Sequence, residues 1–302
     1  MSLDDPNPAR GGALSAACPF DAADAVDVDL PISTSTPASR DPHTPPASTP
    51  EADELLRAAF ARTPTEAFHD YIRSDSFPCV GAKAALVQSQ ITVSEAGDIR
   101  MPTHDVEIYR AIKAFRDTLH RDKPIVQSFA VIYPDSGPMD EKLFERAMWE
   151  RLQCLHNFDA IAGEEWAPDV QPDPDNPHFS MSVGGEAFFV VGLHPGAHRP
   201  ARCFRHPVMV FNSHDQFERM RADGRFDRMK TIIRKRDAAL SGSTNPVLDD
   251  FGNTSEARQY AGRKTEEGWT APLVIKSDGP PETEVIEPQP GLAKPAVPVA
   301  DD

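Results

Sequence analysis

Three histidines lie where predicted strands end, and a strand end can hold a side chain at the mouth of a pocket. His178 opens a β-rich stretch, His194 closes it, and His214 follows the strand VMVFN. On a rigid backbone, an imidazole at such a position can ligate a metal or transfer a proton. Each histidine taken alone is better explained as a helix cap or as a partner of a loop carbonyl. The three together indicate a site.

Arginines and acids near these histidines offer charged partners. Arg199 and Arg202 lie in the loop PGAHRPAR that follows the second predicted strand end. Guanidinium groups form bidentate pairs with carboxylates or phosphates, although ordinary surface ion pairs are also common. The acids that we expect to bind a cationic substrate are Glu186, Asp250 and Glu256. Turn and capping chemistry is the alternative role for these three acids.

Cys79 lies in SFPCVGAKAAL, before a small-residue segment that starts either a helix or a strand. A cysteine at a helix N-terminus can have a lowered pKa and act as a nucleophile or as a thiolate ligand. A cysteine between proline and valine is more often a small buried hydrophobic residue. The four cysteines are widely scattered, and no HExxH or CxxC spacing occurs, so neither a zinc site nor a disulfide framework is predicted.

Hydrophobic periodicity predicts the elements that position these residues. The expected fold class is α+β (mixed α/β), a single domain with a central sheet flanked by helices. The predicted helices are 54–74 (two, separated by Pro64), 103–122 (capped by Thr103), 139–159, 214–224 and 226–242; the predicted strands are 125–134, a hairpin in 178–195 that turns at Gly184 and Gly185, and 207–212.

Composition separates a folded middle from two acidic ends. Residues 1–53 and 274–302 are rich in Pro, Ser, Thr and acids, and this composition predicts disordered tails around a domain at 54–273. The formal net charge is -16, but most of it lies in residues 1–54 and 277–302, so the part between them carries only about -3. Without a clustered basic stripe, nucleic-acid binding is not expected, and the basic run MKTIIRKRD is interpreted as a solvated helix face.

The sequence contains no apolar run of transmembrane length, and MSLDDPNPARGG lacks the order of a secretory signal. We therefore expect a cytoplasmic protein without a membrane partner.

Several blocks of the sequence, taken in order, resemble the YqcI/YcgG family. The blocks are FPCVGAKAAL, LQCLHNFD, PDPDNPHFSMSVGGEAFFVVGLHP with RPAR, VFNSHDQFERMR, IRKRD and NPVLDDFGNTSEARQYAGR. The resemblance covers essentially the whole predicted domain and leaves out the tails. The family includes haem-dependent N-oxygenases that hydroxylate guanidine nitrogens of arginine and related compounds, so the resemblance implies haem, dioxygen and a small guanidine or amine substrate.

The resemblance assigns roles to the residues singled out above. Since no CxxCH motif occurs, the haem would be noncovalent haem b. We expect His194 to be the axial ligand of the iron, with His214 second and Cys79 as the thiolate alternative. Arg199 and Arg202 would pair with the haem propionates. Glu186, Asp250 or Glu256 would bind the substrate cation.

The leading hypothesis is a haem-dependent monooxygenase that N-hydroxylates a guanidine or amine group. The dinucleotide motif GxGxxG is absent, so electrons would come from an external donor such as a ferredoxin or a reductase. Two alternatives stay open: a non-enzymatic haem-binding or sensor protein, and a haem-free enzyme with Cys79 as nucleophile.

Overall fold

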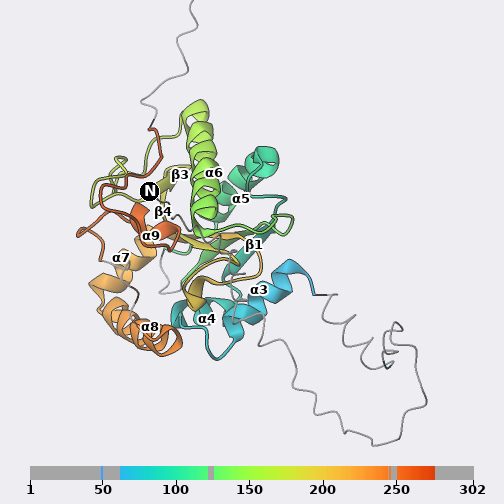
Figure 1. The fold of residues 1–302 in the computed structure, drawn as a ribbon. Helices are drawn as coiled ribbons and strands as arrows, with labels where there is room; N and C mark the ends of the chain where they lie inside the picture. The colour runs from blue at the N-terminus through green and yellow to red at the C-terminus, as the bar shows by residue number, and fades with distance from the viewer. Residues whose placement is uncertain (1–48, 50–61, 122–125, 244, 246–249, 276–302) are drawn as a thin grey trace, which may run out of the picture.

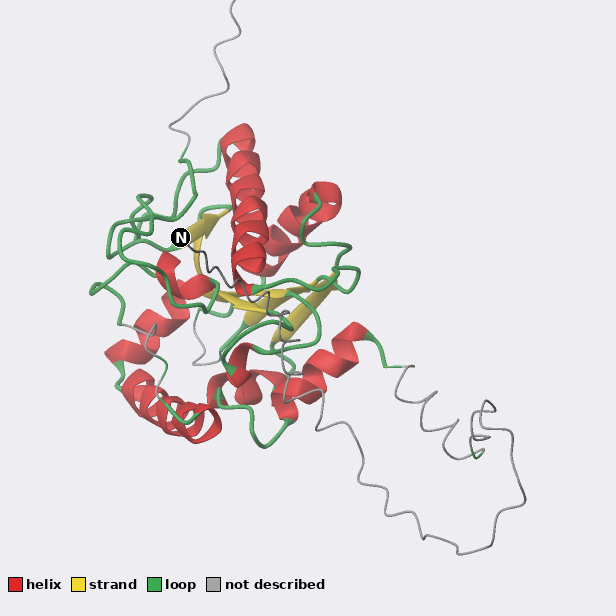
Figure 2. Ribbon diagram, in the orientation of Figure 1, coloured by secondary structure: helices red, strands yellow, loops and turns green. Residues whose placement is uncertain are grey.

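The computed structural model describes residues 49, 62–121, 126–243, 245 and 250–275. These residues form three layers, with a central sheet between two sets of helices (Figure 1 and Figure 2). The predicted α+β class is confirmed. Both predicted tails lie almost entirely outside the described residues.

The sheet has five strands in the order β1-β2-β5-β4-β3. Only β1 and β2 pair in parallel, and the other neighbours are antiparallel. The predicted hairpin is confirmed, because β3 and β4 meet at Gly184 and Gly185, whose φ angles of 60° and 75° favour glycine in a tight two-residue turn. The strands are β1 (Ile91–Glu95), β2 (Ser128–Ile132), β3 (Met181–Val183), β4 (Glu186–Leu193) and β5 (Val208–Ser213).

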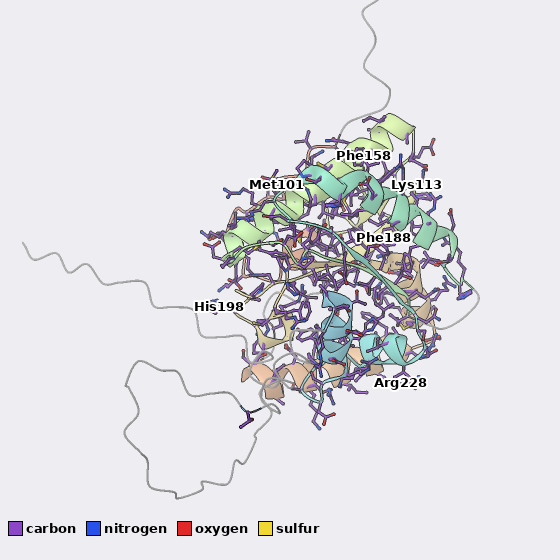
Figure 3. The ribbon with its side chains drawn as sticks, turned by 90° about the vertical axis from the view of Figure 1, so that its right-hand side faces the viewer. Met101, Lys113, Phe158, Phe188, His198 and Arg228 are labelled. Carbon is purple, nitrogen blue, oxygen red and sulfur yellow. The ribbon has the colours of Figure 1, made fainter. Side chains whose placement is uncertain are left out.

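We call the side of the sheet that packs on α5 (Asp105–Asp117) and α6 (Glu141–Ala162) the first face. In Figure 3, Lys113 and Phe158 label these two helices on one side of the sheet. The α6 helix begins at the predicted place because the Asp140 carboxylate accepts a hydrogen bond of 2.7 Å from the Leu143 N–H. The fully buried side chains of this face include Ile112, Phe144, Met148, Leu152, Phe179, Phe188 and Phe211.

We call the opposite side of the sheet the second face. Its helices are α3 (Pro64–Arg73), α4 (Val80–Val87), α7 (His214–Ala222) and α8 (Arg225–Ser241), and Arg228 of α8 lies on this side in Figure 3. The side chains of Phe68, Tyr71 and Phe77 form a small apolar core between α3, α4 and the sheet. A short helix, α9 (Ala257–Tyr260), packs against β4.

One predicted helix boundary was wrong. Thr103 does not cap α5, because it lies in a 3₁₀ turn, Pro102–His104, and His104 precedes the helix. Pro64 begins α3, where its missing N–H costs nothing, and Thr63 forms a capping box with Glu66. The other helix predicted before Pro64 lies almost entirely outside the described residues. No helix in the described parts of the chain is long and apolar enough to cross a membrane.

Candidate functional site

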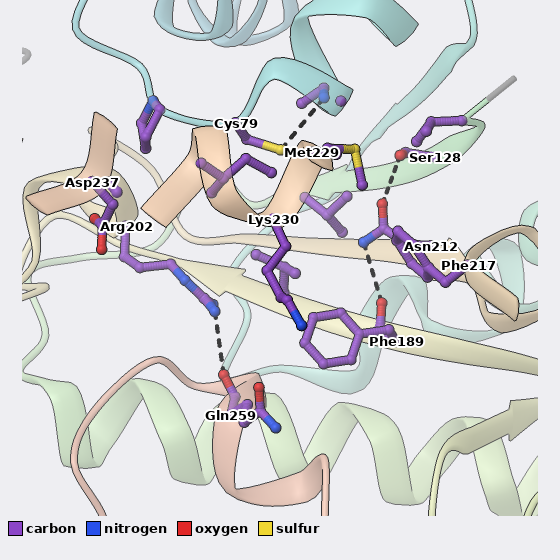
Figure 4. Close-up of a pocket in the computed structure, with 18 of the residues that line it drawn as sticks. Cys79, Ser128, Phe189, Arg202, Asn212, Phe217, Met229, Lys230, Asp237 and Gln259 are labelled. Carbon is purple, nitrogen blue, oxygen red and sulfur yellow. Dashed lines mark hydrogen bonds between the residues drawn. The ribbon is translucent and has the colours of Figure 1, made fainter. Parts of the chain in front are cut away.

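A cavity of about 310 Å³ lies between the second face of the sheet and the helices that cover it. Figure 4 shows Phe189 and Asn212 from the sheet, Cys79 from the start of α4, and Met229 and Lys230 from α8 around it. Most of the lining is apolar, and it includes Phe68, Tyr71, Ile72, Phe77, Ile91, Val126, Phe189, Val191, Leu193, Val210, Phe217, Phe226, Met229, Ile233 and Phe251.

Cys79 is the N-cap residue of α4 and lines the cavity. Its Sγ accepts a hydrogen bond of 3.4 Å from the Ala82 N–H. Burial raises the pKa of the thiol above its usual value, although the N–H groups of Ala82 and Gly81 and the charge of Arg202 oppose this. The free thiol is therefore protonated and a weak nucleophile at neutral pH, whereas a bound metal ion deprotonates a coordinating thiol outright.

Arg199 and Arg202 both line the cavity, but only Arg199 has an acidic partner. Arg199 pairs with Asp237 at 2.6 Å. Arg202 is buried and donates to the carbonyl oxygens of Gly192, Tyr260 and Gln259 at 2.9, 3.2 and 3.3 Å. These bonds connect β4 to the end of α9.

Arg202 has no carboxylate partner among the described residues. Burial lowers the pKa of its guanidinium to about 10, so the group is still charged at neutral pH. A buried cation that has carbonyl partners but no carboxylate partner favours an anionic ligand group in the cavity beside it.

Asp250 and Glu256 also line the cavity, and their surroundings differ. Asp250 lies 3.1 Å from the Lys230 ammonium, so a cation already compensates it. Glu256 is buried, and its Oε2 has no hydrogen-bond partner in the described structure. Burial raises the pKa of the Glu256 carboxyl to about 8. The group is therefore mostly protonated at neutral pH, and it is the acid with capacity to bind a new cation.

His194 does not line the cavity. Side chains alternate between the two faces along β4, and Phe189, Val191 and Leu193 point toward the cavity. His194 lies on the opposite face, where its ring stacks on Phe144 of α6 with a centroid separation of 4.3 Å. Burial lowers its pKa to about 4, and neither ring nitrogen has a hydrogen-bond partner in the described parts of the chain. Its assignment as the iron ligand stays a prediction, without support from this placement.

The three strand-end histidines do not form one group. Since β4 and β5 are antiparallel, the end of β5 that leads to His214 lies beside the start of β4, and His194 lies about 20 Å further along the sheet. His178 and His214 do lie near each other, because both rings contact Phe251, at 5.5 and 4.5 Å. His214 lies behind the cavity wall, next to Glu256.

Glu186 is also outside the cavity. Its carboxylate accepts a hydrogen bond from Ser213 and pairs with Arg121, both at 2.7 Å. Both partners lie at the start of β4, at the opposite end of the strand from Cys79 and Arg202, so the contacts support a structural role.

The contribution of α8 was missed by the sequence interpretation. The run MKTIIRKRD was expected to be a solvated helix face, but Met229, Lys230 and Ile233 line the cavity while Arg228 and Lys235 are exposed. The available signal was the apolar pair Met229 and Ile233, four residues apart on one helix face. The basic residues next to this pair obscured it.

Within the described residues, no three His, Cys, Asp or Glu side chains come together in the way that a metal site made only of protein ligands requires. A haem iron needs only one axial ligand from the protein.

Comparison with known proteins supports the resemblance seen in the sequence blocks. The model of the YqcI/YcgG family matches residues 68–274. Two proteins of Bacillus subtilis (strain 168) are similar to this chain, and both are described as uncharacterized. YqcI is 27% identical over 203 residues, and YcgG is 26% identical over 202; each match covers 64% of this chain and 78% of the relative. No solved structure matches the chain. The chain belongs to the YqcI/YcgG family.

Proposed function

We propose that the chain is a haem-dependent monooxygenase that N-hydroxylates a guanidine or amine group of a small amino-acid-like substrate. The observation that carries the proposal is the position of Cys79. Its sulfur lies at a helix N-terminus, in the wall of a mainly apolar cavity. The geometry favours Cys79 over His194 and His214 as the iron ligand, since only Cys79 lines the cavity.

The lining of the cavity fits a haem group. Its volume falls at the lower end of the range of roughly 300–1,000 Å³ that is typical of ligand sites. A thiolate on Cys79 would gain from the Ala82 N–H and from the start of α4. Arg202, which lacks a carboxylate partner, would compensate a propionate.

Glu256 is the residue that would hold the substrate cation. A guanidinium stays charged at neutral pH, so it pairs with Glu256 only when that carboxyl has lost its proton. Because the free carboxyl is mostly protonated, cation binding at neutral pH would release a proton. Asp250, already compensated by Lys230, is the weaker candidate.

Haem, when bound, supplies the activation of dioxygen, and the overall reaction consumes one O₂, two electrons and two protons to give the N-hydroxyl product and water. The electrons come from an external donor, such as a ferredoxin or a reductase. A cytoplasmic location, as the sequence predicts, would give access to reduced carriers of this kind.

Absorption spectroscopy tests the proposal directly. The full chain is expressed with haem supply, reduced and saturated with carbon monoxide, and we expect the strongly red-shifted Soret band that thiolate ligation gives. Cys79→Ser should lose this band. Cys154→Ser is the matched control, because Cys154 is a second partly buried cysteine on α6, away from the cavity. Absence of haem uptake by the wild type would refute the haem assignment, and an unchanged Cys79→Ser spectrum would refute the ligand.

The two other functions make different predictions. A haem sensor would show the same spectrum but would add no oxygen atom to arginine or related guanidines when supplied with O₂ and reductant; mass spectrometry of the products decides this. A haem-free enzyme with Cys79 as nucleophile has less support, because burial raises the pKa of the Cys79 thiol.

A further inference from the structure

Three side chains form a line from the solvent to the Glu256 end of the cavity. Glu218 on α7 has a side chain that is 46% exposed, whereas the His214 side chain is only 5% exposed. The Glu218 Oε1 lies 3.2 Å from His214 Nε2, and His214 Nδ1 lies 3.8 Å from Glu256 Oε1. Glu256 in turn lines the cavity. The imidazole thus has one nitrogen facing a solvent-exposed acid and the other facing a buried acid.

The fold fixes this alignment locally. His214 is the first residue of α7, directly after β5, and Glu218 lies four residues later on the same face of that helix. Glu256 comes from the residue before α9. The ring of Phe251 lies 4.5 Å from the His214 ring and also lines the cavity, so it separates the histidine from the cavity interior. The His214 ring therefore connects Glu256 to the partly exposed Glu218 on the side away from the cavity.

Burial keeps the His214 ring neutral at neutral pH. Burial lowers its pKa, and Arg221 acts in the same direction, while Glu218, Asp169 and Asp215 oppose it. Arg221 also pairs with Glu218. A neutral imidazole has one N–H and one free nitrogen, which is the state that accepts a proton on one side and gives one up on the other.

We propose that Glu218 and His214 form a proton path through which Glu256 exchanges its proton with the solvent. The Glu256 carboxyl gives its proton to His214 Nδ1, the ring gives the proton on Nε2 to the Glu218 carboxylate, and Glu218 releases it to water. The return transfer, or a ring flip, restores the starting tautomer. The 3.8 Å step is longer than a hydrogen bond, so it needs a small rotation of the Glu256 side chain or one bridging water.

The path deepens the proposed function, and only its use in catalysis rests on that function. Substrate binding in the cavity requires Glu256 to lose a proton, and dioxygen chemistry there consumes two protons for each turnover. The exchange itself is a property of the chain without haem or substrate, so it is testable even if the haem proposal fails.

Infrared spectroscopy of the haem-free full chain tests the path. The difference spectrum between wild type and Glu256→Gln should contain the C=O band of one protonated carboxyl, which shifts when deuterium replaces the proton. After rapid mixing with D₂O we expect this shift to be at least about tenfold slower in His214→Phe, because a phenyl ring relays no proton. Glu218→Gln should slow it as well, and this substitution at a partly exposed position leaves the buried residues in place. His178→Phe is the matched control, because His178 also contacts Phe251 but is exposed.

Two results would overturn the proposal. One is exchange at the wild-type rate in both His214→Phe and Glu218→Gln. The other is the absence of any protonated-carboxyl band assigned to Glu256. The same measurements on haem-loaded protein separate the two proposals, since a normal thiolate spectrum with unaltered exchange in the variants would refute the path alone.

Discussion

The two faces of the sheet are packed in different ways. On the first face, the long helix α6 lies so close to β4 that a Cβ added at Gly192 would meet the Phe144 ring at 2.6 Å and the Tyr260 carbonyl oxygen at 3.0 Å. On the second face, the nearest atom to a Cβ added at Gly81 of α4 would be the sulfur of the flexible Met229 side chain, at 3.0 Å, and the next two atoms lie at 3.8 and 3.9 Å. The first face has no room for an added methyl group at Gly192, whereas the second face borders a cavity.

This difference indicates that stability and function depend on different faces of the sheet. A close-packed face gains the full contact energy of its side chains, while the residues around a cavity lack partners on one side. The candidate ligand Cys79 and the buried ionisable side chains of Arg202 and Glu256 all lie around the cavity. We therefore infer that the first face supplies most of the folding free energy. The second face contains the cavity and the buried polar groups, which lower the stability of the fold.

Two neighbouring residues of β4 provide the strongest test of this comparison. Phe188 is fully buried on the first face, and Phe189 is a partly buried wall of the cavity. Phe188→Ala should lower the free energy of unfolding by about 3–5 kcal/mol, and Phe189→Ala by about 1–2 kcal/mol, because the second side chain has fewer contacts to lose. Urea denaturation measures both. Equal losses in the two variants would contradict the assigned difference between the faces.

The fold was largely predictable from the sequence, because its signals are local. The three-to-four-residue apolar spacing in α5 and α6, and the paired glycines of the hairpin, each determine an element without help from distant parts of the chain. The boundary that was wrong depended on detail. Thr103 is a residue type that often caps a helix, but here it lies in a 3₁₀ turn before α5.

The site was less predictable, because it depends on which side of the sheet is left open. The alternation of side chains along a strand predicts that Leu193 and His194 lie on opposite sides of the sheet. However, the side chains on both sides of FFVVGL are apolar, so the sequence does not indicate which side contains the cavity. Cys79, Arg199, Arg202, Asp250 and Glu256 come together through tertiary packing of segments far apart in the chain. His194 and His214 were selected for their positions at strand ends, and an antiparallel sheet places such ends on opposite edges. Glu186 was selected only as an acid in the hairpin.

A second prediction concerns the buried acid of the cavity. Glu256 has a folded-state pKa of about 8, above its ordinary 4.5. Between these values the folded chain binds more protons than the unfolded chain, so wild-type stability falls as pH rises through this window. Glu256→Gln mimics the protonated acid and removes this loss. The variant should gain on the order of 5 kcal/mol relative to wild type as pH rises from 4.5 to 8, as measured by urea unfolding at several pH values. Parallel pH profiles of the two proteins would contradict the raised pKa.

The smallest effect expected at neutral pH is that of His194→Phe on the first face. The substituted ring keeps the stacking on Phe144 and removes two nitrogens that have no hydrogen-bond partner in the described structure, so stability at pH 7 should change by no more than about 1 kcal/mol. Below pH 6.5 the variant should become the more stable protein. Burial lowers the His194 pKa to about 4, so the wild type loses stability as pH falls from 6.5 through 4, while phenylalanine does not titrate.

In the carbon monoxide spectrum, His194→Phe should match the wild type, whereas Cys79→Ser should not. Loss of the haem spectrum in His194→Phe would instead assign the ligand to the first face and refute the separation of stability from function.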